Sequence, residues 1–171
     1  MQVKIRPYRT DDVAALVDAA RESTREVFPW LPWCHPAFSE SEARGWIESQ
    51  VEAWTQKQAF EFCITDEQSR FLGGCGINQI NLSHRFANVG YWVRTAAAGS
   101  GVASAAVKQA IEFACQHTDL IRLEIVVGVG NFASVRVAEK VGATFEGTLR
   151  NRLLLHGSPH DAHMYSVTLA H

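Results

Sequence analysis

A short loop in the middle of the chain reads Ala98-Gly99-Ser100-Gly101-Val102-Ala103-Ser104. It lies between a predicted strand that ends near Arg94 and a predicted helix that runs from Val102 to about His117. The first N–H groups of a helix lack partners and the helix dipole favours an anion there, while glycines let a ligand approach the backbone closely. The loop therefore fits a phosphate cradle, with an ordinary glycine turn as the alternative.

Two better-known phosphate motifs do not fit this loop. Gly99, Gly101 and Ser104 nearly fill the GxGxxG pattern of dinucleotide-binding folds, but the third glycine is missing and the loop follows an antiparallel meander. The acidic residue expected near the end of the next strand is also absent. The chain has no GxxxxGKS or GxxxxGKT sequence, which excludes a P-loop.

The hydrophobic periodicity on both sides of the loop predicts the other elements. An antiparallel meander of three strands precedes the loop, and a strand-helix-strand crossover follows it. Helices are expected over 13–20, 39–56, 102–117 and 131–141, and strands over 3–6, 60–65, 71–80, 87–94, 121–127, 143–149, 153–156 and 163–169. This order of strands and helices predicts an α/β (α+β) class with a mixed sheet.

Local signals refine two of these elements. Thr10-Asp11-Asp12 is predicted to supply the N-cap of the first helix. Gly73, Gly74 and Gly76 in one predicted strand mark a bulge, or a close approach by another backbone or a ligand.

Composition limits the class of protein. The 171 residues, of which 47% are hydrophobic and 20% charged, predict a single domain over residues 1–171. A net charge of −2 gives no general attraction to nucleic acid or to anionic lipid. No apolar run approaches the roughly 18 residues of a membrane span, so we expect a cytoplasmic protein. No metal site is expected from the spacing of the cysteines, which are Cys34, Cys63, Cys75 and Cys115.

Several further motifs occur in a familiar order. They are Gly90-Tyr91-Trp92-Val93, the loop itself, Asn131-Phe132-Ala133-Ser134, Glu139-Lys140-Val141-Gly142 and Phe145-Glu146-Gly147. Over essentially its whole length the chain resembles the GNAT acetyltransferases. Within that superfamily, Trp30-Leu31-Pro32-Trp33, Leu153-Leu154-Leu155-His156-Gly157, His160-Asp161 and Tyr165-Ser166 resemble the ribosomal-protein N-terminal acetyltransferases of the RimJ/RimL type.

This resemblance implies a splayed, mostly antiparallel mixed sheet, flanked by helices, that binds acetyl-CoA without a metal. Ser134 is implied as the acid for the leaving thiolate, and Trp30 and Trp33 as the flanks of the acceptor channel. The implied cofactor-binding residues are Gly99, Ser100, Gly101, Val102 and Ala103 for the pyrophosphate, Trp92, Val93 and Arg94 for the pantetheine arm, and Asn131 from the second helix of this half.

The chain departs from the family pattern at three positions. Ala98 replaces the usual Gln or Arg of the loop, and Ala138 replaces a Tyr that many members use as the acid. Asn88 stands where related proteins often carry a carboxylate. The general base therefore stays open among Glu61, His84, His160 and an ordered water.

The leading functional hypothesis is acetyl transfer, by direct attack in a ternary complex, to a protein N-terminal α-amine. An α-amine is roughly 10% neutral at pH 7, whereas a lysine is neutral only ~0.04% of the time, so a site without a strong base suits the α-amine. A small-molecule amine (an aminoglycoside, a polyamine or an amino-acid derivative) and a non-catalytic acetyl-CoA-binding module are the alternatives. A homodimer stays open, and neither nucleic acid nor a membrane is expected as a partner.

Overall fold

The computed structural model describes residues 2–170. The strands of this part of the chain form one seven-stranded sheet of order β1-β2-β3-β4-β5-β7-β6. The strands are β1 (Lys4–Pro7), β2 (Phe60–Thr65), β3 (Phe71–Asn81), β4 (Phe86–Val93), β5 (Arg122–Gly128), β6 (Thr144–Leu155) and β7 (Ser158–Thr168). The helices are α1 (Val13–Glu22), α2 (Thr24–Val27), α3 (Glu40–Thr55), α4 (Val102–His117) and α5 (Phe132–Lys140), with 3-10 turns η1 (Thr10–Asp12) and η2 (Thr95–Ala97). The predicted mixed α/β fold is confirmed.

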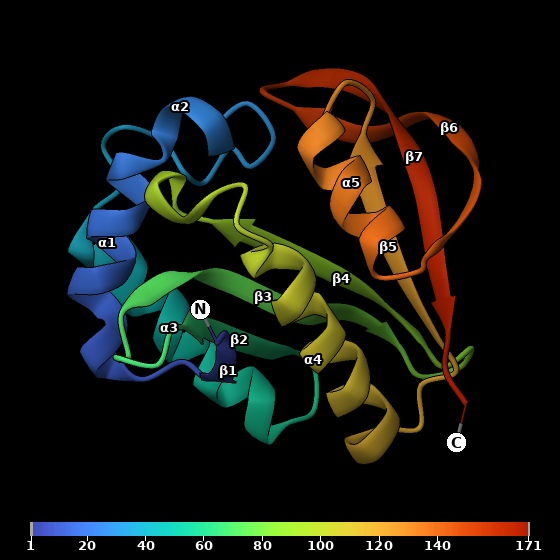
Figure 1. Cartoon of the computed structure of the whole chain (residues 1–171), viewed down its shortest axis with the longest axis horizontal. Coiled ribbons are helices and arrows are strands. Elements are labelled where there is room, and N and C mark those ends of the chain that lie inside the picture. The colour runs from blue at the N-terminus through green and yellow to red at the C-terminus, as the bar shows by residue number, and fades with distance from the viewer. Residues whose placement is uncertain (1, 171) are drawn as a thin grey trace.

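The sheet is splayed between β4 and β5. These two strands are the parallel pair, and they pair only where Phe86, Ala87 and Asn88 meet Arg122, Leu123 and Glu124. The other neighbouring strands are antiparallel. Figure 1 shows β4 and β5 diverging from this common end, with α4 and α5 on the viewer's side. Residues 89–93 of β4 thus have an edge that no strand covers.

Each face of the first four strands has its own apolar core. In β2, Phe60, Phe62 and Ile64 belong to the core beneath α4, whereas Cys63 belongs to the core beneath α1 and α3. This alternation is the period-2 pattern that predicted the strand. The glutamate at position 61 consequently lies on the α1 and α3 face.

The structure differs from the predicted elements at both ends. The segment Thr10–Asp12, predicted to supply the N-cap of α1, forms η1, and Asp12 is the N-cap residue of α1 without a capping bond from its side chain. Its carboxylate instead accepts hydrogen bonds from the Arg6 guanidinium and the Arg9 N–H, at 2.7 and 2.8 Å. The predicted strands 143–149 and 153–156 form one strand, β6, interrupted by an irregularity between Leu149 and Leu153. The next strand, β7, begins at Ser158 rather than 163.

The glycines of β3 have two roles. A bulge occurs in β3 next to Gly73, because Ile64 pairs with Gly73 while the next residue of β2, Thr65, pairs with Phe71. This is one of the two roles predicted for these glycines. Gly74 and Gly76 make room for side chains of this chain rather than for another backbone: a Cβ at Gly74 would lie 2.5 Å from the Tyr8 hydroxyl oxygen, and a Cβ at Gly76 would overlap the Glu61 carboxyl group. Among the helices within residues 2–170, none is both long and apolar enough to cross a membrane.

Candidate active site

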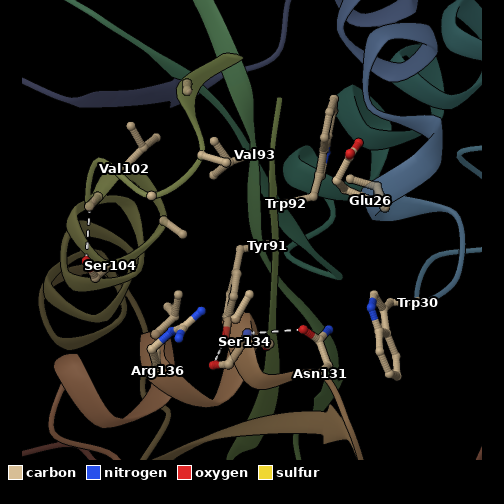
Figure 2. A pocket seen from close by; sticks show the side chains of 18 of the residues that line it. Glu26, Trp30, Tyr91, Trp92, Val93, Val102, Ser104, Asn131, Ser134 and Arg136 are labelled. Atoms are coloured by element: carbon tan, nitrogen blue, oxygen red, sulfur yellow. Dashed lines mark hydrogen bonds between the residues drawn. The ribbon is translucent and has the colours of Figure 1, made fainter. Parts of the chain in front are cut away.

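A first cavity of about 400 Å³ lies between the start of α4, the open part of β4 and α5. Figure 2 shows Tyr91, Trp92 and Val93 of β4 along one side of it, with Ser134 and Arg136 of α5 across from Val102. The cavity thus lies where the sheet is splayed.

The glycine loop forms one end of this cavity. Gly101 is the N-cap of α4 in a left-handed conformation, with φ of 82°, and the N–H of Ala105 is the first to bond to its carbonyl oxygen. The N–H groups of Val102, Ala103 and Ser104 therefore have no helical acceptor and lie at the positive end of the helix dipole. Four of the predicted loop residues line the cavity: Gly99, Gly101, Val102 and Ala103. Ser100 does not line it, and its hydroxyl donates to the Ala97 carbonyl at 2.7 Å.

Two basic residues face the same cavity, and the sequence reasoning missed them. Arg136 and Lys140 lie on α5 among the lining residues. They are four positions apart, so one face of the helix presents both, and this spacing after Asn131 was the available signal. Their cationic groups can replace the polar contribution that Ala98 does not make.

The predicted pantetheine residues fall into two groups. Trp92 and Val93 line the cavity. Arg94 does not, because its N–H donates to the Leu72 carbonyl at 2.8 Å and its guanidinium pairs with Glu22 and with Asp18 of α1. Along an antiparallel strand, the N–H and C=O groups of successive residues point to alternate edges of the strand. Because the Arg94 N–H points to β3, the main-chain groups of residues 91 and 93 face the open edge, and those of 92 and 94 do not.

Ser134 is held by two neighbours on the cavity wall. The Asn131 side-chain oxygen accepts from the Ser134 N–H at 3.2 Å and caps α5, and the Tyr91 hydroxyl lies 2.8 Å from the Ser134 Oγ (Figure 2). Burial raises the pKa of Tyr91 far above its usual value, so its hydroxyl keeps its proton. Tyr91 lies in the motif Gly90-Tyr91-Trp92-Val93, which predicted no role for its hydroxyl.

A second cavity, of about 450 Å³, lies on the α1 and α3 side of the sheet and shares Leu31, Tyr91 and Trp92 with the first. Aromatic side chains form much of its wall, and the carboxyl groups of Glu42 and Glu61 line it as well. Trp33 lies here, in edge contact with Trp92 at 5.2 Å between ring centroids. Trp30, by contrast, lines the first cavity.

Of the predicted candidates for a general base, Glu61 lies in a cavity. Burial raises its pKa, and the hydrogen bond from Asn78 Nδ2, at 2.8 Å, offsets only part of that effect. His160 lies beyond both linings, in contact with Trp30 and the Val129 carbonyl, and His84 lies in the exposed turn after β3. No cluster of His, Cys, Asp and Glu suited to a metal occurs in the described part of the chain.

Comparison with known proteins identifies the family. The model of the acetyltransferase (GNAT) domain matches residues 2–144. YdaF of Bacillus subtilis (strain 168), whose name assigns it provisionally to the ribosomal N-acetyltransferases, is 27% identical over 169 residues, 96% of this chain and 90% of YdaF. The ribosomal-protein-serine acetyltransferase of Escherichia coli (strain K12) is 28% identical over 136 residues, 80% of this chain and 75% of that protein.

A solved structure supports the same conclusion for the fold. RimL, a ribosomal L7/L12 alpha-N-protein acetyltransferase in complex with coenzyme A, superposes with a TM-score of 0.91 at 24% identity, covering 99% of this chain and 95% of RimL. The family match takes in the glycine loop, the open part of β4 and the whole of α5. Sequence, fold and site order therefore agree that this chain belongs to the GNAT acetyltransferases and is an N-acetyltransferase of that family.

Proposed function

We propose that this protein transfers the acetyl group of acetyl-CoA to the α-amine of a protein N-terminus, as ribosomal-protein acetyltransferases do. The observation that carries the proposal is the meeting of two unlike cavities at Tyr91 and Trp92 of β4. The first suits a phosphate-bearing thioester and the second suits an amine. The relatives named for ribosomal-protein acetylation and the coenzyme A complex of RimL support this reading.

In this proposal the first cavity binds acetyl-CoA. The free N–H groups at the start of α4, together with Arg136 and Lys140, hold the diphosphate. The open main-chain edge at residues 91 and 93 pairs with the amides of the pantetheine arm as an added strand would. The Val93 N–H then stabilises the negative charge that develops on the acyl oxygen.

The proposed chemistry needs one proton for the departing thiolate. Ser134 lines the same cavity as the open strand edge and supplies this proton, directly or through a water molecule. The serine then recovers a proton from the acceptor nitrogen, and its contact with Tyr91 holds its hydroxyl in place. A nascent or ribosomal acceptor places the activity in the cytoplasm.

A panel of pentapeptides tests the proposal. The protein is incubated with acetyl-CoA and peptides that begin with Ser, Ala, Thr, Met or Gly, and both products are followed by chromatography and mass spectrometry. We expect coenzyme A release with at least one free peptide and none with its Nα-acetylated twin. Coenzyme A release with none of the free peptides would contradict a protein N-terminus as the acceptor.

Acetylation of a small amine is the second candidate. The second cavity has a volume of about 450 Å³ and a largely aromatic wall, which are typical of small-molecule sites. The same assay with spermidine, an aminoglycoside and methionine amide separates the two candidates. Turnover with one of these compounds, and with no peptide, favours the small-molecule reading.

A further inference from the structure

We propose that the face of β3 at Gly74 and Gly76 seats the acceptor's primary amine between the Tyr8 hydroxyl and the Glu61 carboxyl, and that Glu61 is the general base. This inference rests on the proposed acetyl transfer and names the atoms that recognise its acceptor.

Tyr8 supplies the first half of this amine seat. Its hydroxyl oxygen is buried and has no hydrogen-bond partner within residues 2–170. The ring is held in place by two aromatic contacts. It packs edge-on against Trp46, at 4.9 Å between ring centroids, and at a tilt against Phe71, at 6.3 Å. The residue lines the second cavity. A buried hydroxyl without a partner is costly, so this one fits a site that awaits a ligand.

Glu61 supplies the second half. Its carboxyl group lies over Gly76, and one oxygen, Oε1, accepts from Asn78 Nδ2 at 2.8 Å. Asn78 in turn accepts from Asn88 Nδ2 at 2.9 Å. The asparagine that replaces the family's carboxylate on β4 is thus linked through β3 to a carboxylate on β2, whose Oε2 can meet a ligand.

The two groups are close enough to hold one amine. Gly74 and Gly76 are two positions apart on a strand, so they share a face and lie about 6.6 Å from each other. Burial raises the pKa of Tyr8, and the nearby Cys63 and Glu61 side chains add to this effect. An ammonium carries three N–H donors, enough for both oxygens, and the rings of Trp33 and Trp46 can stabilise its charge from the cavity wall.

The proton balance assigns Glu61 its role. The acceptor arrives as an ammonium, and Glu61 takes one proton and passes it to water. The nitrogen lone pair then forms the C–N bond to the acetyl carbon, the C–S bond breaks with its electrons on sulfur, and the nitrogen loses a second proton. The thiolate takes one proton from the Ser134 hydroxyl, which recovers the second, so each turnover releases one proton.

The same balance favours an α-amine over a lysine. Burial raises the pKa of Glu61 from the ordinary value of a carboxyl group, which lies well below that of an amine. An α-ammonium gives up its proton roughly 300-fold more readily than a lysine side chain, given reference pKa values of about 7.9 and 10.4. We therefore expect kcat/KM for alanine amide to exceed that for Nα-acetyl-lysine amide by about this factor.

Tyr8→Phe tests the binding half. Removal of an unpaired buried hydroxyl leaves the ring contacts intact, so we expect unchanged or higher thermal stability, while KM for alanine amide rises about 10-fold and affinity for acetyl-CoA is unchanged. A purely structural Tyr8 would instead lose stability with no change in KM, and that result would overturn its place in the seat.

Glu61→Gln tests the base. We expect kcat/KM to fall by ~10²- to 10⁴-fold near pH 7, and the acidic limb of the pH profile to disappear, leaving only the limb of the amine itself. The titratable groups that face Glu61 are Tyr8, Cys75 and, across the cavity, Glu42. Glu48→Gln, an exposed carboxylate on α3, is the matched control. Loss of the acidic limb in Glu42→Gln instead would overturn the assignment.

Binding separates this inference from the proposed function. With coenzyme A present, alanine amide is titrated while the fluorescence of the cavity tryptophans is followed. One outcome is that the wild type binds alanine amide without turnover and that Glu61→Gln and Tyr8→Phe weaken this binding. That result would refute acetyl transfer and support the amine site at Tyr8 and Glu61. Turnover that neither variant alters would keep acetyl transfer and refute the seat, as would a wild type that neither binds nor acetylates the probe.

Discussion

At the scale of the residue, the contact between Tyr91 and Ser134 brings two hydroxyls together on the wall of the first cavity. The Tyr91 hydroxyl lies 2.8 Å from the Ser134 Oγ and donates to the Ser134 carbonyl at 3.1 Å. Because burial keeps the tyrosine protonated and its proton goes to the Ser134 carbonyl, the tyrosine oxygen can accept from the Ser134 hydroxyl and hold the Ser134 Oγ in place.

Ser134→Ala should therefore lower kcat without removing activity. We expect a loss of about 10²-fold, at the lower end of the range for one acid-base group, because a water molecule can still supply the proton. The dissociation constant for acetyl-CoA, measured by calorimetry, should stay within about two-fold, since a serine hydroxyl aimed at the sulfur contributes little to binding. An unchanged kcat would remove Ser134 from the mechanism.

The basic side chains of α5 give a second prediction at this scale. Arg136→Ala should raise the dissociation constant for acetyl-CoA about 10-fold, as expected for the loss of one charge-assisted hydrogen bond to phosphate. The effect should shrink at high salt, because salt screens exposed charges. Arg44→Ala, at an exposed arginine on α3 that lines neither cavity, is the control. Equal affinities at low salt would contradict a phosphate contact.

At the scale of the element, small local features place the chemical groups. The side chain of Asn131 caps α5 and so fixes the turn that holds Ser134. Strand β3 has glycines at positions 74 and 76, and the Tyr8 hydroxyl and the Glu61 carboxyl group occupy the space that their side chains would fill. The sheet thus accommodates the second cavity on one face while β4 leaves its edge open to the first.

Two glycine substitutions separate packing from flexibility. Gly76→Ala places a methyl group where the Glu61 carboxyl lies, so we expect a loss of about 1–3 kcal/mol of stability together with a large fall in kcat/KM. Gly45→Ala, in the interior of α3 with no atom within 4 Å of the new Cβ, should gain about 0.5–1 kcal/mol and keep full activity. Urea unfolding and steady-state kinetics check both variants. Similar stabilities would show that the space at Gly76 is not needed.

The arm formed by β5, β6 and β7 should respond to acid through one carboxylate. Hydrogen bonds from Arg122 and Ser166 lower the pKa of Glu146 to about 2. A carboxylate whose pKa is depressed on folding stabilises the fold above its ordinary pKa, about 4.3, and this contribution is lost as the pH falls toward 2. The urea midpoint of Glu146→Gln should lie below that of the wild type at pH 6 and approach it near pH 2. A constant difference across this range would contradict the assignment.

At the scale of the whole molecule, the chain is two half-sheets joined by the three-residue ladder between β4 and β5. The first cavity touches α4 and β4 on one side and α5 on the other, so a ligand there links the halves across the splay. The binding of acetyl-CoA is therefore also a contribution to global stability.

A thermal shift measures that contribution. Acetyl-CoA at 100 times its dissociation constant should stabilise the fold by about 2.7 kcal/mol, which for a chain of this size raises Tm by about 5–10 °C. Hydrogen exchange should slow in β4 and α5 together. Protection confined to α4 would show that the ligand does not link the two halves.

The sequence predicted what depends on neighbouring residues and missed what depends on register. The start of α4 after the glycine loop and the start of α5 after Asn131 follow from a few adjacent residues, and the structure has both helices there. Arg94 was predicted to contact the cofactor, but its partners Glu22 and Asp18 lie 72 and 76 residues earlier, and no local pattern reveals such pairs. Glu61 meets Asn78 only because β2 and β3 pair in one register.

The glycines of β3 also have a genetic consequence. Any single-base change that alters a glycine codon specifies Ala, Ser, Cys, Val, Asp, Glu, Arg or Trp, or a stop, and each of these residues carries the Cβ that has no room at Gly74 or Gly76. No one-step missense mutation at either codon can therefore preserve the present arrangement of Tyr8 and Glu61.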